Sequence, residues 1–305
     1  MMKSEAQSGT NHRRVSAGIR VIRGFISDSR RALALSQRVG LRISFGLRVS
    51  VFGFLLLFPW ASMAQVKDPN PPPTPLEPAE GERQARALVA NLLAQKPDAN
   101  ITNSGMVRIR DANGKRKALS ANFGIVVTST NYSTTYEVLA TNGQPGSKLV
   151  IIHSDNQPNR YLLSDGSVSN AIPKELTGSQ LMTPFAGSDF WVADLGLDFL
   201  HWPGQRILEK GMRKSVFCAV LLSSNSNSIP GGYSTVKSWI GTSHPDETVL
   251  VHAEAFDRAG KRLKQFDPED LEKVNGAYQL QSMRMADDQR GSSTIIEFNL
   301  KPEEK

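Results

Sequence analysis

MVRIRDANGKRKALSANFGIVVT, residues 106–128, carries the clearest strand and turn signals after residue 64. Apolar and polar residues alternate over 106–110, which is typical of a strand with one buried face. Asn113-Gly114 follows, and this dipeptide is a strong signal for a tight turn between antiparallel strands. Residues 117–128 then supply the second strand, so the stretch predicts a β-hairpin.

The same rhythm of short strands and turns continues along most of the chain. Further strands are expected over 134–140, 149–153, 161–163, 215–223, 233–240, 248–256, 262–266, 278–285 and 293–300. No βαβ alternation interrupts them. The pattern therefore predicts one meandering antiparallel sheet of about ten or eleven strands.

Two segments have the periodicity of helices rather than strands. Over 80–95, one apolar stripe at helical spacing comprises Ala85, Leu88, Val89, Leu92 and Leu93, and Pro97 ends it. Residues 172–202 hold the densest group of large apolar side chains after residue 64 and suggest two short helices. Both segments are expected to cover one face of the sheet, which gives an α+β fold.

The N-terminal 64 residues have the features of an export signal. Ten Lys and Arg residues precede or border VSVFGFLLLFPW at 49–60, and Ala61-Ser62-Met63-Ala64 supplies small residues for cleavage. A helix of twelve residues spans about 18 Å, too short for a bilayer core of about 30 Å. The sequence predicts a signal peptide at 1–64. Because no Cys lies near residue 65, the mature protein is expected not to be lipid-anchored.

Four consecutive parts are expected along the chain. The signal peptide is followed by a proline-rich linker at 65–79, which contains six prolines. Such a run favours extended polyproline II and makes a stiff, exposed tether. A single folded domain at 80–301 and a short tail at 302–305 complete the chain.

Charge and cysteine content exclude two classes of protein. Ten of the 36 Lys and Arg residues, but only two of the 29 Asp and Glu residues, lie in 1–64, so the remainder has a net charge of −1. A nucleic-acid-binding domain needs an excess of basic residues, and residues 65–305 have no such excess. Cys218 is the only cysteine, which excludes a disulfide scaffold.

No motif in the sequence points to catalysis, a metal or a cofactor. Zinc-ligand spacing, Gly-x-Ser-x-Gly, phosphate-binding glycine loops and the dinucleotide fingerprint are all missing. A hydrolase is the least favoured interpretation. It would use Asp189 with Asp194, or His252 with Glu254, within hydrogen-bond reach inside a cleft.

The chain resembles the outer-membrane lipoprotein-sorting proteins, which are related to the periplasmic carrier of the Lol pathway. The resemblance covers roughly 80–300 and rests on short motifs in the same order, namely Gly187-Ser188-Asp189-Phe190, Asp194-Leu195, Phe199, Trp202-Pro203, and Gly105, Cys218, Tyr233, Trp239, Gly260-Lys261, Lys264, Met283, Met285 and Thr294. Two motifs depart from the family's pattern. Phe190-Trp191-Val192-Ala193-Asp194-Leu195 is more apolar than the usual Phe-Ser-Tyr-Glu-Asp-Leu, and Trp239-Ile240-Gly241 replaces Trp-Ile-Asp.

The resemblance implies a strongly curved, unclosed half-barrel whose concave face is covered by helices, with an apolar cavity between them. The expected function is a soluble periplasmic carrier or binder of lipid or lipoprotein acyl chains, without covalent chemistry. Inner-membrane export proteins and outer-membrane acceptor proteins are candidate partners, and the protein is expected to be a monomer. The candidates for the cavity lining or its lid are Leu88, Leu92, Phe185, Phe190, Trp191, Leu195, Phe199 and Trp202. The alternative is a non-transporting structural or sensory domain with a packed interior.

Overall fold

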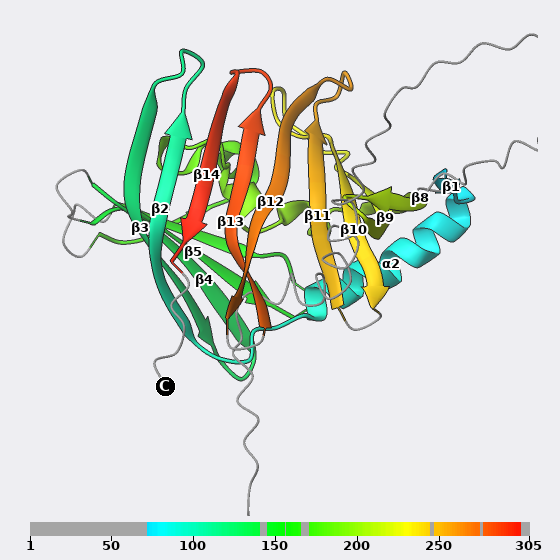
Figure 1. The fold of residues 1–305 in the computed structure, drawn as a ribbon, viewed down its shortest axis with the longest axis horizontal. Helices are drawn as coiled ribbons and strands as arrows, with labels where there is room; N and C mark the ends of the chain where they lie inside the picture. Colours follow the sequence, from blue (N-terminus) through cyan, green and yellow to red (C-terminus); the bar gives the residue numbers. More distant parts are fainter. Residues whose placement is uncertain are drawn as a thin grey trace, which may run out of the picture.

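A computed structural model describes residues 72–140, 145–155, 157–165, 171–244, 247–274 and 277–299. These residues form one 14-stranded sheet in the order β1-β8-β9-β10-β11-β12-β13-β14-β2-β3-β4-β5-β6-β7. Each neighbouring pair is antiparallel, and β1 and β7 lie at the two edges, so the sheet does not close. The prediction of an unclosed antiparallel meander is confirmed (Figure 1).

The strands run in chain order except at two places, where β1 pairs with β8 and the last strand, β14, pairs with β2. One half of the sheet comprises β2 (Ile101–Arg110), β3 (Arg116–Val127), β4 (Asn131–Leu139), β5 (Pro145–Ser154), β6 (Arg160–Asp165) and β7 (Lys174–Leu176). The other half comprises β1 (Thr74–Pro75), β8 (Gly204–Arg213), β9 (Val216–Ser224), β10 (Thr235–His244), β11 (Glu247–Phe256), β12 (Arg262–Val274), β13 (Ala277–Asp287) and β14 (Ser292–Phe298).

The expected number of ten or eleven strands is too small, because β1, β7 and β8 carry no clear strand pattern. β1 and β7 have only two and three residues, which is too short for any alternation to show. In β8, a register shift between Ile207 and Glu209 breaks the alternation. All three strands form through pairing with a neighbour rather than through their own sequence preference.

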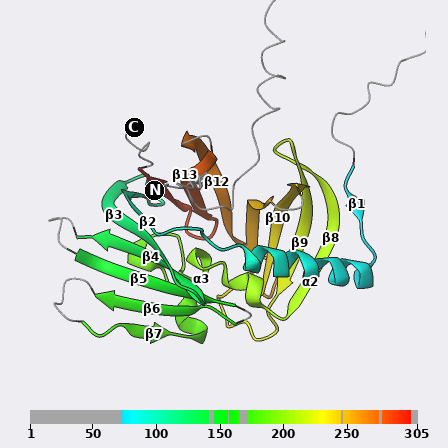
Figure 2. The same cartoon turned by 90° about the horizontal axis from the view of Figure 1, so that it is seen from below.

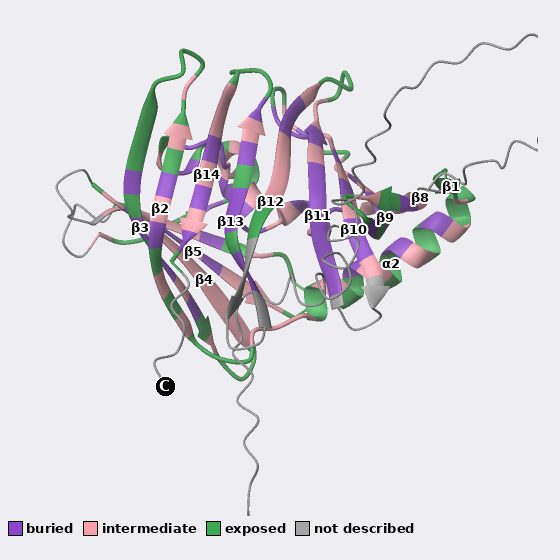
Figure 3. Cartoon of the chain, viewed as in Figure 1, coloured by how far each residue is buried: buried purple, intermediate pink, exposed green. Residues whose placement is uncertain are grey.

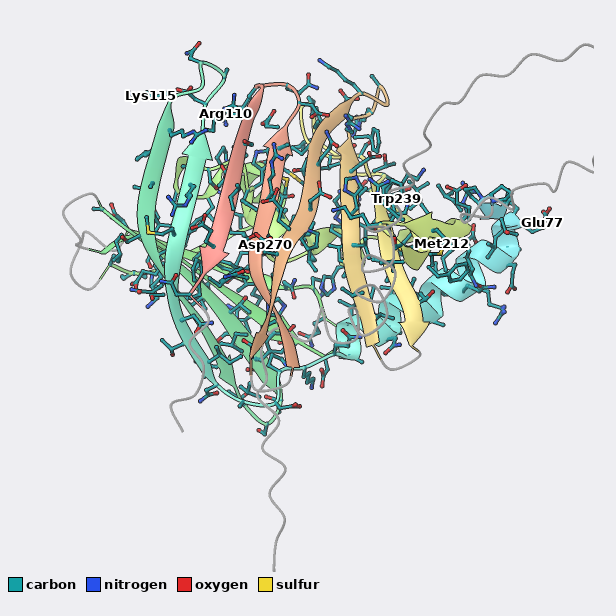
Figure 4. The ribbon with its side chains drawn as sticks, viewed as in Figure 1. Glu77, Arg110, Lys115, Met212, Trp239 and Asp270 are labelled. Atoms are coloured by element: carbon teal, nitrogen blue, oxygen red, sulfur yellow. The ribbon has the colours of Figure 1, made fainter. Side chains whose placement is uncertain are left out.

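Helix α2 (Pro78–Ala94) lies against β8 at one end of the sheet (Figure 1). It begins at Pro78, close to the predicted start, where a missing N–H costs nothing. Glu77, labelled in Figure 4, precedes it. Gly81, Ala85 and Val89 are its buried residues. A Cβ at Gly81 would overlap the Ile207 carbonyl oxygen, so glycine permits the close approach of helix and strand.

The second helical segment, which we call the plug, spans residues 178–202. It comprises three 3₁₀ turns and one short helix, η2 (Gly178–Met182), η3 (Phe185–Gly187), α3 (Val192–Leu195) and η4 (Asp198–His201). Figure 2 shows the sheet curving around α3, with β2–β7 on one side and β8–β10 on the other. The expected helical cover of the concave face is therefore present.

The buried apolar residues form two clusters, visible as the purple bands of Figure 3. One cluster joins the plug to the β2–β6 half and includes Leu149, Ile151, Tyr161 and Phe190. The other joins α2 and η4 to the β8–β11 strands. The plug therefore packs against both halves of the sheet. A cavity can then lie between the plug and the concave face of the strands.

Cys218 on β9 is fully buried and is the free thiol of the described chain. Burial raises the pKa of its thiol to about 11. A thiol with such a pKa is a poor nucleophile, which fits a structural role.

The expected signal peptide, residues 65–71 of the proline-rich linker and the expected tail at 302–305 lie outside the described residues. Within the described ranges, no helix is long and apolar enough to cross a membrane.

Candidate functional site

A cavity of about 260 Å³ lies between the concave face of the sheet and the plug. The strands contribute apolar side chains from both halves of the sheet, among them Ile125, Tyr136, Leu250, Met283 and Phe298. The plug contributes a second apolar wall from α3 and η4. Ligand cavities in proteins are typically apolar with a few polar groups, and this cavity has that character.

The cavity reaches the protein surface near the end of α2. Leu93, which is 37% exposed, and Lys96 both line it there. Tyr132, His153 and His201 add polar groups to the same lining. An elongated apolar molecule could enter at this end and leave a polar group near the surface.

Four of the eight candidate residues line the cavity, namely Leu92, Phe190, Leu195 and Phe199. The other four pack elsewhere. Phe185 belongs to the buried cluster that joins the plug to the β2–β6 half. Leu88, Trp191 and Trp202 belong to the other cluster, around α2 and η4. The high density of large apolar side chains in the plug does not distinguish residues that line the cavity from residues that fill the core, because both positions need such side chains.

Buried polar contacts attach Asp189, in the middle of the plug, to the sheet. The Asp189 carboxylate accepts hydrogen bonds from Ser292 Oγ at 2.5 Å and from Thr294 Oγ1 at 2.7 Å, both on β14. Lys264 on β12 donates from Nζ to the Asp189 carbonyl oxygen at 2.6 Å. Asp189 is 2% exposed, so these partners replace the water that burial removes.

Lys264 is also the centre of a second group of contacts within the plug. Its Nζ lies 3.6 Å from Asp194 Oδ2 and 3.7 Å from the centre of the Trp191 ring. Asp194 Oδ2 accepts the Trp191 backbone N–H at 2.7 Å and the Tyr233 hydroxyl at 3.2 Å. Trp191 stacks on Tyr233 with ring centres 4.5 Å apart. We call Asp189, Trp191, Asp194, Tyr233 and Lys264 the anchor cluster.

Burial dominates the electrostatics of the anchor cluster. It lowers the pKa of Lys264 to about 8, although the carboxylates of Asp194, Asp287 and Asp189 oppose the shift. Burial likewise raises the pKa of Asp194 and raises that of Tyr233 well above its usual value. Asp189, Asp194, Tyr233, Lys264 and Thr294 are all landmarks of the family resemblance, and the structure brings them together.

The residues considered for hydrolysis are engaged in other contacts. His252 Nδ1 lies 2.9 Å from Asp267 Oδ1, and its Nε2 lies 3.4 Å from Glu254 Oε1. The His252 ring is also 5.0 Å from that of Trp239 on β10, which is labelled in Figure 4. His252, Glu254, Asp267 and Trp239 do not line the cavity, whereas Asp194 does. Both Asp189 and Asp194 are held by the contacts of the anchor cluster.

His153 on β5 is the titratable group at the cavity with the largest consequence for pH dependence. Its ring stacks on Tyr132 at 4.4 Å, and its Nε2 lies 3.1 Å from Thr134 Oγ1. Burial lowers the pKa of His153 to about 4, a shift opposed by the hydrogen bond between His153 and Asn159. Burial also lowers the pKa of His201. Both rings are therefore neutral at pH 7.

Acidification between pH 6.5 and 4 is expected to destabilise the fold. In that window the unfolded chain binds a proton that folded His153 does not, so the free energy of unfolding falls as pH falls, by up to about 3 kcal/mol. Denaturant unfolding at pH 7 and pH 4.5 measures this loss. His153→Gln, which no longer titrates, should reduce the difference between the two pH values. An equal loss in wild type and variant would contradict the assignment.

Comparison with known proteins gives a family model and a set of similar folds. A family model described as an uncharacterized protein matches residues 149–301. No curated protein matches the chain. Among solved structures, a DUF1329 family protein from Desulfovibrio piger has a TM-score of 0.58 at 16% identity, over 73% of this chain and 93% of that one.

Two further solved structures carry names that refer to lipoprotein sorting. A domain named as an outer membrane lipoprotein-sorting protein, from Vibrio parahaemolyticus, has a TM-score of 0.58 at 15% identity and covers 73% of this chain and 91% of that one. A LolA superfamily protein from Nitrosomonas europaea has a TM-score of 0.50 at 14% identity and covers 72% and 94%. At these identities the likeness shows the fold, and it confirms the family resemblance drawn from the sequence at that level.

Proposed function

We propose that this chain, which belongs to a family of uncharacterized proteins and has a fold like that of lipoprotein-sorting proteins, binds the acyl chain of a lipid or lipoprotein in its cavity. The apolar cavity of about 260 Å³ between sheet and plug carries the proposal. Burying each methylene there contributes about 0.8 kcal/mol, so an acyl chain supplies enough affinity without covalent chemistry.

The proposed setting is the periplasm, reached through the signal peptide at 1–64. Transit of an acylated cargo through water requires that the chain be shielded, which an apolar cavity with an outlet near α2 provides. The proposed form is a soluble monomer that is not lipid-anchored. It would take cargo from an inner-membrane export protein and pass it to an outer-membrane acceptor.

A non-transporting binding or sensory domain is the second candidate. The observation that favours it is the anchor cluster, which attaches the plug to β12 and β14 through buried polar contacts. A plug held this firmly suits a stable ligand-bound or packed state better than repeated opening.

Filling the cavity is expected to abolish acyl-chain uptake. Ile125 on β3 lines the cavity and is 8% exposed, so Ile125→Trp places an indole where the chain would lie. Val126, the next residue, is 50% exposed and does not line the cavity. Since adjacent side chains of a strand point to opposite faces, Val126→Trp is the matched control.

The measurement is uptake of a fluorescent medium-chain acyl ester, which has no charged head, by the purified mature protein. We expect at least a tenfold loss of affinity in Ile125→Trp, with unchanged affinity in Val126→Trp and folding of both variants checked by circular dichroism. Mass spectrometry of organic extracts of the wild-type protein should also find an acylated molecule. If wild type binds no acyl probe and carries no lipid, the proposal is wrong.

A further inference from the structure

The cavity lining contains few charges, and the structure neutralises each of them. Lys96 is its cation at the outlet, and its Nζ lies 2.7 Å from Asp155 Oδ2. Asp194 is the carboxylate at the plug, and Lys264, Tyr233 and the Trp191 N–H satisfy it. The cavity lining that the structure describes therefore contains no unpaired charge that could bind a ligand of opposite charge.

The remaining polar groups of the lining, around the outlet, are uncharged groups that can form hydrogen bonds. Among the described residues, the Tyr132 hydroxyl and the His201 ring have no hydrogen-bond partner, although both line the cavity and both are half-buried. Asn159 Nδ2 donates to the Gly196 carbonyl oxygen at 2.7 Å, and the Asn159 side chain also bonds to His153, so this amide is already engaged. Burial keeps His153 and His201 uncharged at pH 7. The outlet therefore offers both donors and acceptors without net charge.

The size of the cavity limits how much apolar chain it holds. A methylene is close in size to a water molecule, whose share of liquid volume is about 30 Å³. A cavity of about 260 Å³ then takes on the order of nine such groups. This is one medium-length acyl chain, whereas a lipid with two or three long chains exceeds the space.

We infer that the ligand is a single-chain amphiphile of about ten carbons with an uncharged, hydrogen-bonding head, of which a monoacylglycerol is the simplest example. This inference rests on the proposed function and narrows its ligand class. A carboxylate head among half-buried neutral groups would lose water without gaining a cation, which opposes its binding. A glycerol head meets the Tyr132 hydroxyl and the His201 ring with complementary donors and acceptors.

The test compares ligands that share one chain and differ in the head. The full mature protein is loaded with a fluorescent acyl probe, which is then displaced by monodecanoylglycerol, decanoate or decylammonium at pH 7. We expect monodecanoylglycerol to displace the probe at a concentration at least tenfold lower than either ion. Didecanoylglycerol, with two chains, should be the weaker competitor of the two glycerides.

Variants of the outlet separate head recognition from chain binding. Tyr132→Phe and His201→Phe each remove one neutral polar group, so the affinity for monodecanoylglycerol should fall about threefold to tenfold. The affinity of the same variants for decanoate should fall less, so the preference for monodecanoylglycerol over decanoate should shrink, which a general loss of folding would not reproduce.

Each outcome bears on a distinct claim. Equal or tighter binding of decanoate or decylammonium overturns the uncharged-head inference and leaves the proposed function standing. Equal displacement by didecanoylglycerol overturns the single-chain assignment. If no acyl compound displaces the probe, or the probe itself does not bind, the proposed function fails as well.

Discussion

Lys264→Met is expected to lower the free energy of unfolding by about 3–5 kcal/mol, because it removes one partner of a buried ion pair and leaves the other uncompensated. Lys264 is 2% exposed and contacts the Asp189 carbonyl oxygen, the Asp194 carboxylate and the Trp191 ring. For a domain of this size, such a loss lowers the Tm by roughly 10 °C. Thermal and denaturant unfolding of the two proteins measure it.

A second substitution tests whether the cost comes from the unpaired carboxylate. Asp194→Asn keeps an oxygen that can accept the Trp191 N–H and the Tyr233 hydroxyl, but it removes the charge. In the Lys264→Met background it should restore at least about 1 kcal/mol, since coupled neighbours are not additive. Strictly additive losses would show that Lys264 and Asp194 do not act as a pair.

The pH dependence of the wild-type protein has a defined sign at this site. Burial lowers the pKa of folded Lys264 to about 8, against 10.5 for the unfolded side chain. Between these values the unfolded chain binds more protons, so the contribution of Lys264 to the free energy of unfolding rises with pH. The stability gap between wild type and Lys264→Met should therefore widen from pH 8 to pH 10.

Trp191→Ser is expected to lower the free energy of unfolding by about 3 kcal/mol, the lower end of the usual loss for a truncated core aromatic, because Trp191 is half-buried. Trp191 stacks on Tyr233 and lies under the Lys264 ammonium, and it does not line the cavity. Its role in the structure is thus to hold the plug against the sheet. Phe217, which is 43% exposed on β9, provides the control Phe217→Ser with little effect on stability.

Uptake of the fluorescent acyl probe distinguishes this role from that of a mobile lid. At a temperature where Trp191→Ser remains folded, its probe affinity should stay within about threefold of wild type, since the cavity wall is intact. A variant that melts like wild type but takes up little probe would contradict the anchoring role and assign Trp191 to a lid over the cavity.

Local sequence patterns were sufficient for most of the sheet. The alternation over 106–110, the Asn113-Gly114 turn and the repeated short strands predicted eleven of the fourteen strands, and the apolar stripe from Ala85 to Leu93 predicted α2. These features depend on residues close in the chain, whose periodicity states which face is buried. The predicted end of the helix agrees with the structure for the same reason, since Pro97 cannot continue it.

β1 and β7, which have no strand pattern in their own sequence, form by pairing with neighbouring strands. β1 exists because Thr74 and Pro75 pair with Lys210 and Glu209 on β8. β7 is similarly defined by its pairing with β6. Such short edge strands gain their hydrogen bonds only in the assembled sheet, so no window of sequence could indicate them.

The sequence by itself determined the antiparallel meander, the apolar helix and the apolar plug, because each is specified by the spacing of neighbouring residues. Only the tertiary structure decided that Phe190 and Phe199 line the cavity while Phe185 and Trp202 do not. It also decided that Lys264 meets Asp189 and Asp194, some seventy residues away. Burial and polar pairing depend on distant segments packing together, and composition and periodicity carry no information about which segments meet.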